Sequence, residues 1–190
     1  MRTVTYSAAC SLDGYIAGSD GSFDWLYFSP DVEELMGQFW STVDAVLMGR
    51  KTWEFSAGQD FSAEESAGDG TAADLSGIPP VTTYLFSRTL PEAPDGVELV
   101  TSDAGGFVNR LKQQPGKGIF LMGGGELAAS LFEAGAIDVV SLNVHPVLLG
   151  SGVPFFRPQS RRIALELTES RAIDGGCVLM TYRVRNQGSR

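Results

Sequence analysis

The sequence predicts one α/β domain in three layers, α/β/α, whose mostly parallel sheet ends in an antiparallel hairpin. Short apolar runs typical of strands alternate through most of the chain with segments whose apolar residues recur at helical spacing. The end of the chain breaks this alternation, because residues 163–172 and 177–184 look like two strands paired around Asp174-Gly175-Gly176. A length of 190 residues fits a single core, so residues 1–190 are expected to form one domain.

In the first half of the chain, we expect a strand, a helix and a second strand. Residues 4–9 are rich in small and β-branched side chains, as a first strand would be. Ser29 fits the N-cap of the helix and Pro30 fits its first position. The apolar face of this helix is expected to consist of Leu35, Met36, Phe39, Trp40 and Val43. Residues 45–48 then form a short apolar strand that runs into Gly49.

The second half of the chain continues the alternation. Its expected strands are residues 82–86, 97–100, 119–122 and 139–144. Phe107 and Leu111 mark one helix, which Pro115-Gly116 ends. The next helix is marked by Leu127, Leu131 and Phe132. Between the halves, residues 56–77 are rich in Ser, Ala, Gly, Asp and Glu and are expected to form a long polar loop.

Charge and composition exclude several classes of protein. Acidic side chains number 23 and basic ones 14, and the formal charge of −9 argues against binding to nucleic acids or anionic membranes. Cys10 and Cys177 are isolated, so we expect two buried, reduced thiols and neither a disulfide scaffold nor a metal site. The N-terminus lacks the apolar stretch of a signal peptide, which predicts a soluble, cytoplasmic protein.

The run Gly123-Gly124-Gly125 directly follows an apolar strand and precedes a helix. Glycine lets a ligand approach the backbone closely, and a helix N-terminus offers free N–H groups to a phosphate. The alternative is a plain strand-to-helix turn, but three consecutive glycines cost more chain entropy than such a turn requires. The run therefore predicts an anion site, although its spacing is not that of a Rossmann fingerprint.

Two further strand ends carry groups suited to an anion. Gly49-Arg50-Lys51-Thr52 offers a guanidinium and a hydroxyl to phosphate oxygens at an expected helix start. A solvated Arg-Lys pair at a helix end explains these residues equally well when they are taken alone. Ser87-Arg88-Thr89 follows the next strand and suits a ribose 2′-phosphate, which favours NADPH over NADH. Together, the three strand ends indicate one dinucleotide site.

These motifs resemble those of two related groups of reductases. Residues 49–54, Gly-Arg-Lys-Thr-Trp-Glu, are similar to the cofactor-phosphate motif of dihydrofolate reductases. Residues 11–18 and 123–152 resemble the reductase domain of bifunctional riboflavin-biosynthesis deaminase–reductases and their free-standing relatives. The resemblance spans roughly the whole chain. It implies a dihydrofolate-reductase-like fold, NADPH as the hydride donor and a homodimer.

The resemblance also implies roles for individual residues. Ala9 and Ile16 are expected to flank the nicotinamide. The cofactor phosphates are expected to meet Gly49, Arg50, Lys51 and Thr52, the 2′-phosphate Ser87 and Arg88, and the pyrophosphate Gly123, Gly124, Gly125, Glu126 and Leu127. Folate-type reductases have a cis peptide bond at the glycine turn, so one is expected between Gly123 and Gly124.

The chain departs from the family pattern at two points. The deaminase half needs a His/Cys/Cys zinc site, whereas this chain has a single histidine, His145, and isolated cysteines, so no deaminase is expected. Met122 stands where the riboflavin-type reductase has a glutamate, which leaves the substrate open. His145 has no triad partners in view and Asp13 lies in a turn, so both are expected to be structural.

Hydride transfer to a C=N bond is helped by protonation of the nitrogen, so a carboxylate facing the substrate is expected. Folate reductases carry one on their first helix, and counting along the chain points to Asp31 or Glu33, with Glu34 as a further alternative. Acidic residues are also favoured in a first helical turn by the helix dipole alone. Asp24 and Trp25, in the preceding turn, are expected to line the substrate pocket, although Trp25 equally fits a cap on the core.

Three functions follow as hypotheses. The first is an NADPH-dependent reductase of a small heterocycle that is like 5-amino-6-(5-phosphoribosylamino)uracil or like a pteridine. The second is a true dihydrofolate reductase. The third is a non-catalytic NADPH-binding regulatory domain.

Overall fold

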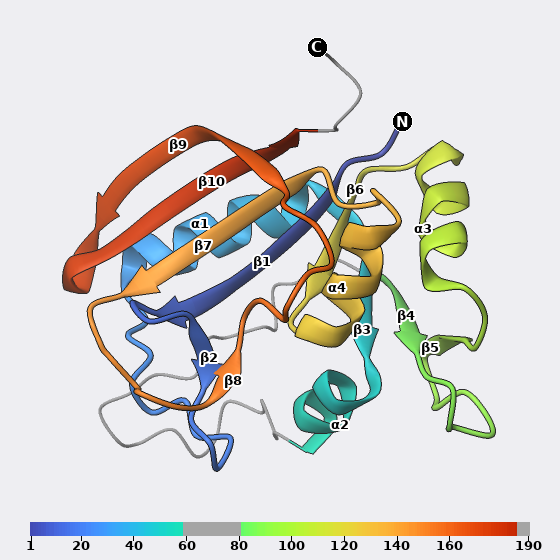
Figure 1. Ribbon diagram of the computed structural model, residues 1–190, viewed down its shortest axis with the longest axis horizontal. Coiled ribbons are helices and arrows are strands. Elements are labelled where there is room, and N and C mark those ends of the chain that lie inside the picture. Colours follow the sequence, from blue (N-terminus) through green and yellow to red (C-terminus); the bar gives the residue numbers. More distant parts are fainter. Residues whose placement is uncertain (59–80, 186–190) are drawn as a thin grey trace.

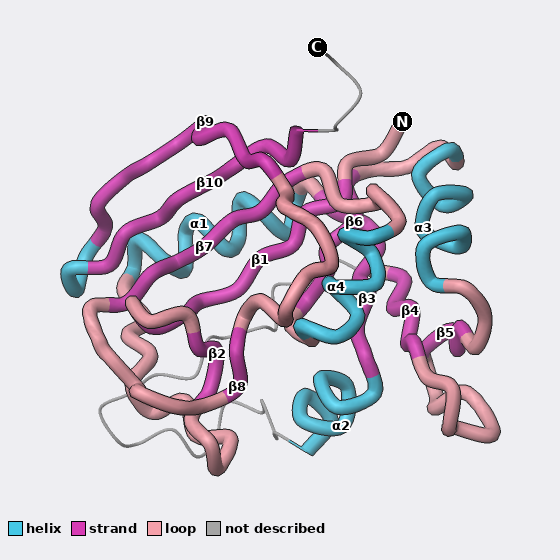
Figure 2. The backbone as a smooth tube through the Cα atoms, in the orientation of Figure 1, coloured by secondary structure: helices cyan, strands magenta, loops and turns pink. Residues whose placement is uncertain are grey.

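The structure is a computed structural model that describes residues 1–58 and 81–185. Its strands are β1 (Val4–Ser11), β2 (Tyr15–Ala17), β3 (Val43–Gly49), β4 (Thr82–Phe86), β5 (Val97–Val100), β6 (Gly118–Met122), β7 (Val139–His145), β8 (Val153–Pro154), β9 (Ala164–Ile173) and β10 (Cys177–Arg185). Its helices are α1 (Pro30–Ser41), α2 (Arg50–Gly58), α3 (Ala104–Gln113) and α4 (Gly125–Glu133), and a 3₁₀ turn (Asp174–Gly176) joins β9 to β10. Figures 1 and 2 show their arrangement.

Eight of the strands form one sheet, in the order β5-β4-β3-β6-β1-β7-β10-β9. The strands from β5 to β7 run parallel to one another, and β10 runs antiparallel to both of its neighbours, β7 and β9. Helix α1 lies behind the sheet in Figure 1, and α3 and α4 lie in front of it. The predicted three-layer α/β domain, with its C-terminal hairpin, is confirmed.

The centre of the sheet is apolar on both faces because helices cover both. On β3, Ala45 and Leu47 belong to the core that includes residues of α3 and α4. Val46 and Met48 belong instead to the core on the other face, which includes Trp40 of α1. A strand that is buried on both faces reads as a continuous apolar run, which is how this one appears in the sequence.

Helix α1 begins where the sequence predicts. The Ser29 hydroxyl accepts a hydrogen bond from the Val32 amide (3.3 Å), and Pro30 occupies the first turn. The helix ends at Ser41, and the Thr42 amide and hydroxyl both donate to the Phe39 carbonyl. The inclusion of Val43 in the helical face is therefore wrong, because this β-branched residue already starts β3.

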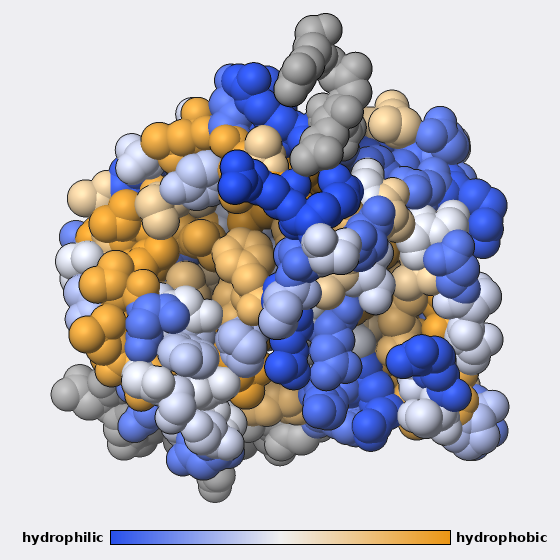
Figure 3. All heavy atoms as spheres, in the orientation of Figure 1, coloured by the Kyte–Doolittle hydropathy of each residue, from blue (hydrophilic) through white to orange (hydrophobic). Residues whose placement is uncertain are grey.

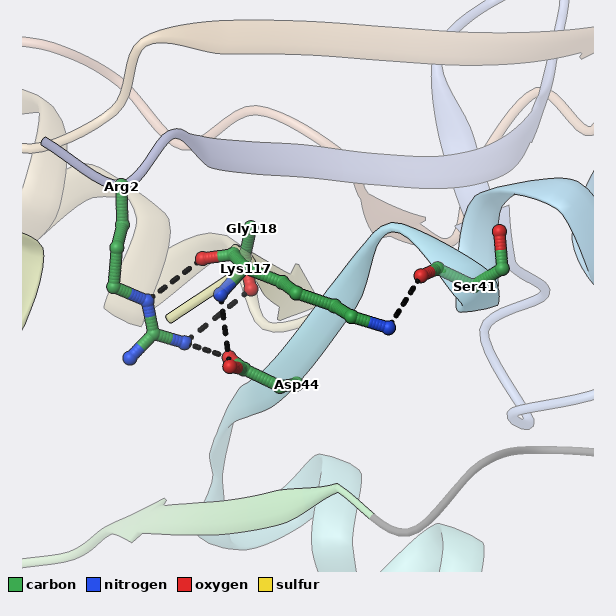
Figure 4. Close-up of polar contacts among 5 residues, drawn as sticks. All are labelled: Arg2, Ser41, Asp44, Lys117 and Gly118. Carbon is green, nitrogen blue, oxygen red and sulfur yellow. Dashed lines mark hydrogen bonds and ion pairs between the residues drawn. The ribbon is translucent and has the colours of Figure 1, made fainter. Parts of the chain in front are cut away.

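A cluster of polar contacts closes the amino-terminal edge of the sheet (Figure 4). The Arg2 Nε atom donates to the Lys117 carbonyl (2.7 Å), and the guanidinium forms an ion pair with Asp44. The Lys117 amide donates to the same carboxylate (2.8 Å), and its ammonium donates to the Ser41 carbonyl (2.9 Å). A cavity of about 430 Å³ lies beside these contacts. Parallel sheets bind ligands at their carboxyl ends, so we interpret this opposite edge as structural.

The small sheet of β2 and β8 is missing from the sequence prediction. β8 has only two residues, which is too short for a pattern. A Cβ atom added to Gly152 would lie 2.1 Å from the Ala17 carbonyl oxygen, so glycine is required for the close approach of the two segments. The predicted polar loop, residues 56–77, lies almost entirely outside the described residues. No helix of the described chain is long and apolar enough to cross a membrane.

Candidate functional site

Three strands bring their carboxyl ends together at one edge of the sheet. β3 lies between β4 and β6, the register pairs Gly49 with Phe86, and β6 ends immediately before Gly123. The turns that begin at Gly49, Ser87 and Gly123 therefore occupy neighbouring positions of this edge (Figure 1). They are far apart in the sequence, and the parallel topology makes them neighbours.

The turn after β6 consists of two glycines in the left-handed conformation. Gly123 has a φ of 56° and Gly124 a φ of 71°, values that residues with a Cβ atom rarely adopt. The expected cis peptide bond between them is wrong, because the described residues contain no cis bond. The two left-handed glycines reverse the chain with trans peptides instead.

The two glycine turns touch each other through Thr52, which lies in the first turn of α2. A Cβ atom added to Gly123 would lie 3.3 Å from both the hydroxyl and the methyl group of Thr52. One added to Gly124 would lie 3.4 Å from the same hydroxyl. The motifs at Gly49–Thr52 and Gly123–Gly125, which are separate in the sequence, thus form one surface that consists of glycine backbone and the Thr52 hydroxyl.

Helix α4 begins at Gly125 with open N-terminal amides. Its first internal hydrogen bond runs from the Ala128 amide to the Gly124 carbonyl (3.0 Å). No side-chain cap is present at this end, so the amides of Gly125, Glu126 and Leu127 have no acceptor among the described residues. These N–H groups and the positive end of the helix dipole make the turn suitable for an anion.

Charged side chains flank these amides. Glu126 pairs with Arg157 (3.3 Å), which offsets the negative charge that it brings to the turn. Arg50 pairs with Glu54 of the same helix (2.8 Å), and the two side chains are 41% and 47% exposed. Exposed pairs of this kind contribute little stability, so Arg50 can exchange Glu54 for an anionic ligand. Lys51 is exposed beside it.

The third strand end, after β4, is held by Ser87. This residue is buried, and its hydroxyl oxygen accepts hydrogen bonds from the amides of Thr89 (3.2 Å) and Leu90 (3.1 Å). The serine therefore shapes the turn, and its hydroxyl oxygen also lies 3.4 Å from the Thr89 hydroxyl oxygen. Arg88 is exposed within the turn and is the group there that can reach an anion.

Ala9 and Ile16 lie further along the same edge. Ala9 is half-buried in β1, where it is paired with Asn143 of β7, and β1 adjoins β6. Ile16 lies in β2 and packs against the main core. The order of the eight-stranded sheet thus arranges the predicted cofactor residues in one row, from the turn after β4 to β1, except for Ile16, which lies in the separate sheet of β2 and β8.

Trp25 and His145 lie together beyond this row. Their rings are 5.4 Å apart in an edge-on arrangement. The Trp25 Nε1 atom is buried and has no hydrogen-bond partner among the described residues. Asp24 is exposed next to it. Buried N–H groups without a partner are rare in folded proteins.

His145 ends β7 as a buried side chain in a defined hydrogen-bonding environment. Its Nδ1 atom lies 3.5 Å from the Tyr27 amide nitrogen and 3.4 Å from the Cys177 sulfur. An amide can only donate, so Nδ1 accepts and the ring proton belongs on Nε2. Nε2 lies 3.3 Å from the Asn143 side-chain amide, whose buried oxygen otherwise lacks a partner among the described residues. We infer that this oxygen faces Nε2–H.

Burial keeps His145 neutral, and we expect this to appear in the pH dependence of the protein's stability. Desolvation lowers its pKa below the ordinary value of 6.5. Below pH 6.5, His145 is protonated more readily in the unfolded chain than in the folded one. The stability that the neutral, buried ring contributes is therefore complete above pH 6.5, and it is lost as the pH falls toward the folded-state pKa. His145 is the single histidine, so ring-labelled NMR should show one neutral Nε2–H signal at pH 6. Titration at or above 6.5, or a proton on Nδ1, would contradict this assignment.

Both cysteines are free and buried, as the sequence predicts. Burial raises the pKa of Cys10 to about 11 and raises the pKa of Cys177 above its ordinary value. Both thiols are therefore protonated and unreactive at neutral pH.

Comparison with known proteins identifies the family. Residues 2–179 match the RibD C-terminal domain. The chain belongs to this family. The uncharacterized protein YyaP of Bacillus subtilis (strain 168) is 32% identical to it over 183 residues, which cover 96% of this chain and 95% of that protein.

Two solved structures share the fold of this RibD C-terminal domain. A protein named for riboflavin biosynthesis, from Shewanella sp. PV-4, is 24% identical with a TM-score of 0.77, over 97% of this chain and 99% of that one. The dihydrofolate reductase of Enterococcus faecalis, solved with NADP(H) and RAB-propyl, is 18% identical with a TM-score of 0.64, over 97% of each chain. The predicted dihydrofolate-reductase-like fold is confirmed.

In this RibD C-terminal domain, Asp31 and Glu33 are both exposed at the start of α1 and bond no other described side chain. Glu33 lies on the helix edge that continues through Trp40, whose side chain packs toward β3 and β6. Asp31 lies on the opposite edge with Leu35, which packs toward β10. Helix geometry therefore places Glu33 on the side of α1 nearer β3 and β6, and Asp31 on the side nearer β10.

Sequence reasoning missed several groups of this domain. Asn143 lies next to Ala9 in the sheet, and only its alternation with apolar residues in β7 marks it in the sequence. The contact of His145 with Cys177 joins residues that are 32 positions apart, and no local sequence pattern predicts it. Within residues 1–58 and 81–185, no group of three or more His, Cys, Asp or Glu is placed to hold a metal ion.

Proposed function

We propose that this RibD C-terminal domain protein is an NADPH-dependent reductase that transfers a hydride to a small heterocyclic substrate. The observation that carries the proposal is the open N-terminus of α4, with bare glycine backbone before it and Thr52 and Arg50 beside it. Free amides, a hydroxyl and a guanidinium are the groups that bind the pyrophosphate of a dinucleotide.

The residues present fit this cofactor. A side chain at Gly123 or Gly124 would fill the space in front of Thr52, so glycine keeps a cradle open there. Arg50 would neutralise phosphate charge, and Arg88 would do so for a 2′-phosphate. NADPH, when bound, supplies the hydride. The dihydrofolate reductase with the same fold was solved with NADP(H), which supports the proposal.

The substrate is proposed to lie between the carboxyl ends of β1 and β7 and the start of α1. The Trp25 Nε1–H group would donate to a carbonyl or ring nitrogen of the heterocycle, with Asp24 beside it. Glu33 would hold a proton near the nitrogen of the reduced C=N bond. This description suits an aminouracil-like or pteridine-like compound. We also propose that the working form is a homodimer.

A panel of reducible aminouracils and pteridines, with NADPH consumption as the readout, tests the reductase. Turnover of at least one compound is expected, and Glu33→Gln should slow it far more than the neighbouring Asp31→Asn. If dihydrofolate alone is turned over, the protein is a true dihydrofolate reductase, which the carboxylate on the first helix also allows. NADPH binding without turnover of any compound would contradict the proposal.

Replacement of Arg88 separates the two nicotinamide cofactors. Loss of charge-assisted hydrogen bonds to a 2′-phosphate costs about 1.5–3 kcal/mol, so Arg88→Ala should weaken NADPH about 10-fold to 100-fold and leave NADH unchanged. Arg110→Ala, which removes an exposed arginine from α3, is the matched control. Equal losses for NADPH and NADH, measured by fluorescence titration, would mean that the 2′-phosphate lies elsewhere.

A further inference from the structure

The segment that follows β8 runs along α4 and brings Arg157 to the start of this helix (Figure 1). Phe155 is 1% exposed and stacks on Tyr6, with ring centroids 4.2 Å apart, so the chain is anchored just before Arg157. Further along, the Ser160 hydroxyl donates to Glu133 at the end of the helix (2.6 Å). Figure 3 shows hydrophilic surface down the centre of the molecule, where this segment passes α4. Contacts at both ends of α4 therefore fix the position of the arginine.

Arg157 packs against the first residue of α4. A Cβ atom added to Gly125 would lie 3.2 Å from the Arg157 Cγ atom, and 3.1 and 3.2 Å from the carbonyl oxygens of Phe155 and Pro154. Glycine thus allows the segment to lie directly on the helix start. The guanidinium then reaches the carboxylate of Glu126, the second residue of the helix, at 3.3 Å. It therefore lies beside the turn whose backbone amides are open.

Stability does not explain an arginine at this place. A cation at a helix N-terminus faces the positive end of the helix dipole, which is unfavourable. The ion pair with Glu126 is long, and the side chains of Arg157 and Glu126 are 43% and 76% exposed, so it contributes little. Glu126 is also the only group among the described residues that the guanidinium bonds, so most of its N–H donors are unused.

We infer that Arg157 binds the pyrophosphate of the dinucleotide, and that Glu126 positions its guanidinium beside the turn. The Glu126 carboxylate would repel an anion at this turn, and Arg157 offsets that repulsion. A guanidinium also presents its N–H groups in a fork that matches phosphate oxygens. Arg157 then exchanges the carboxylate for the phosphate, and Glu126 contributes its backbone amide to the ligand. The inference rests on the proposed function, because it adds a residue to the cofactor site of that reductase.

Arg157 and Arg88 are assigned to different phosphates. Arg88 follows β4, Arg157 lies at the helix that follows β6, and β3 separates these two strands in the sheet. The pyrophosphate is common to NADPH and NADH, whereas the 2′-phosphate belongs to NADPH alone. Loss of Arg157 should therefore weaken both cofactors, unlike loss of Arg88.

Fluorescence titration of the full chain tests this assignment. Arg157→Ala should weaken NADPH and NADH about 10-fold to 100-fold each, which is the effect of losing charge-assisted hydrogen bonds. Arg161→Ala is the matched control, because it removes an arginine of the same segment that donates to the Phe132 carbonyl near the end of α4 (3.1 Å). It should bind both cofactors as the wild type does. Thermal melts should show that both variants are folded.

Glu126→Gln separates binding by Arg157 from a mere offset of charge. This variant has no carboxylate to neutralise, yet adding Arg157→Ala to it should still weaken both cofactors at least about 10-fold. Equal affinities of the Glu126→Gln variant and the double variant would overturn the inference, because Arg157 would then act only on Glu126. An Arg157→Ala variant that binds both cofactors as tightly as the wild type would also overturn it, and the proposed reductase would stand.

Inorganic pyrophosphate distinguishes a failure of the inference from a failure of the proposed function. Isothermal titration should show that pyrophosphate binds to the wild type and to Arg161→Ala, and at least about 10-fold more weakly to Arg157→Ala. This result without binding of NADPH or NADH would uphold Arg157 as the anion ligand and contradict the proposed cofactor. Equal binding of pyrophosphate by the wild type and Arg157→Ala, or no binding of pyrophosphate or either cofactor by the wild type, would overturn the inference.

Discussion

Gly124→Val is expected to weaken NADPH binding by at least about 100-fold. Gly124 has a φ of 71°, and a Cβ atom there would lie 3.4 Å from the Thr52 hydroxyl and 3.9 Å from the Gly49 nitrogen. The methyl groups of valine extend beyond that Cβ atom into the contact between the two turns. They would separate the turns and cover the backbone that a pyrophosphate must approach.

The control for this prediction is Gly135→Val, at the end of α4. Gly135 has a φ of 61°, and a Cβ atom there would meet nothing within 4 Å. Both variants should lose stability through the left-handed backbone, by about 1–2 kcal/mol each. Only Gly124→Val should lose NADPH, as measured by fluorescence titration beside thermal melts. Similar affinities for the two variants would contradict the assignment of the site.

The second large effect is on stability: Asp138→Ala should lower the free energy of unfolding by about 3 kcal/mol. The Lys112 ammonium lies 2.7 Å from this carboxylate, its side chain is only 4% exposed, and it otherwise reaches just the Ala136 carbonyl. The Asp138 carboxylate also accepts from the Val4 amide (2.9 Å). Its removal leaves a buried cation and a backbone donor without their partner.

The matched comparison is the double variant Lys112→Met/Asp138→Ala. Methionine removes the buried charge and keeps the length of the side chain, so urea unfolding should recover most of the lost stability. A double variant that is no more stable than Asp138→Ala would show that the cost comes from the Val4 amide alone.

The parts of the fold that depend on local pattern were predictable. The apolar run of β3 and the Asp174–Gly176 turn can each be predicted from a pattern of a few neighbouring residues. The pairing of β2 with β8 could not be predicted in this way, because it depends on the contact of Gly152 with Ala17 and not on any run of residues. Strand order likewise depends on long-range packing, and the sequence supports it only through the family resemblance.

The candidate site also combines features that a local pattern predicts with features that depend on long-range contacts. Gly123 to Gly125 could be predicted as a site from the sequence because backbone freedom and helix position are local properties. The contact of Thr52 with these glycines joins segments about 70 residues apart, and spacing could not reveal it. The prediction of a cis bond between Gly123 and Gly124 was wrong because it was taken from the family resemblance. In this chain, two glycines with positive φ form the turn.

The most direct test of the central claim, a dinucleotide held at the glycine turns, is an NMR titration of the uniformly ¹⁵N-labelled chain with NADPH. The amides of Arg50 to Thr52 and of Gly123 to Leu127 should shift together, and Arg88 should respond to NADPH but not to NADH. Unchanged amides at both turns, or shifts confined to the opposite edge around Arg2 and Lys117, would contradict it.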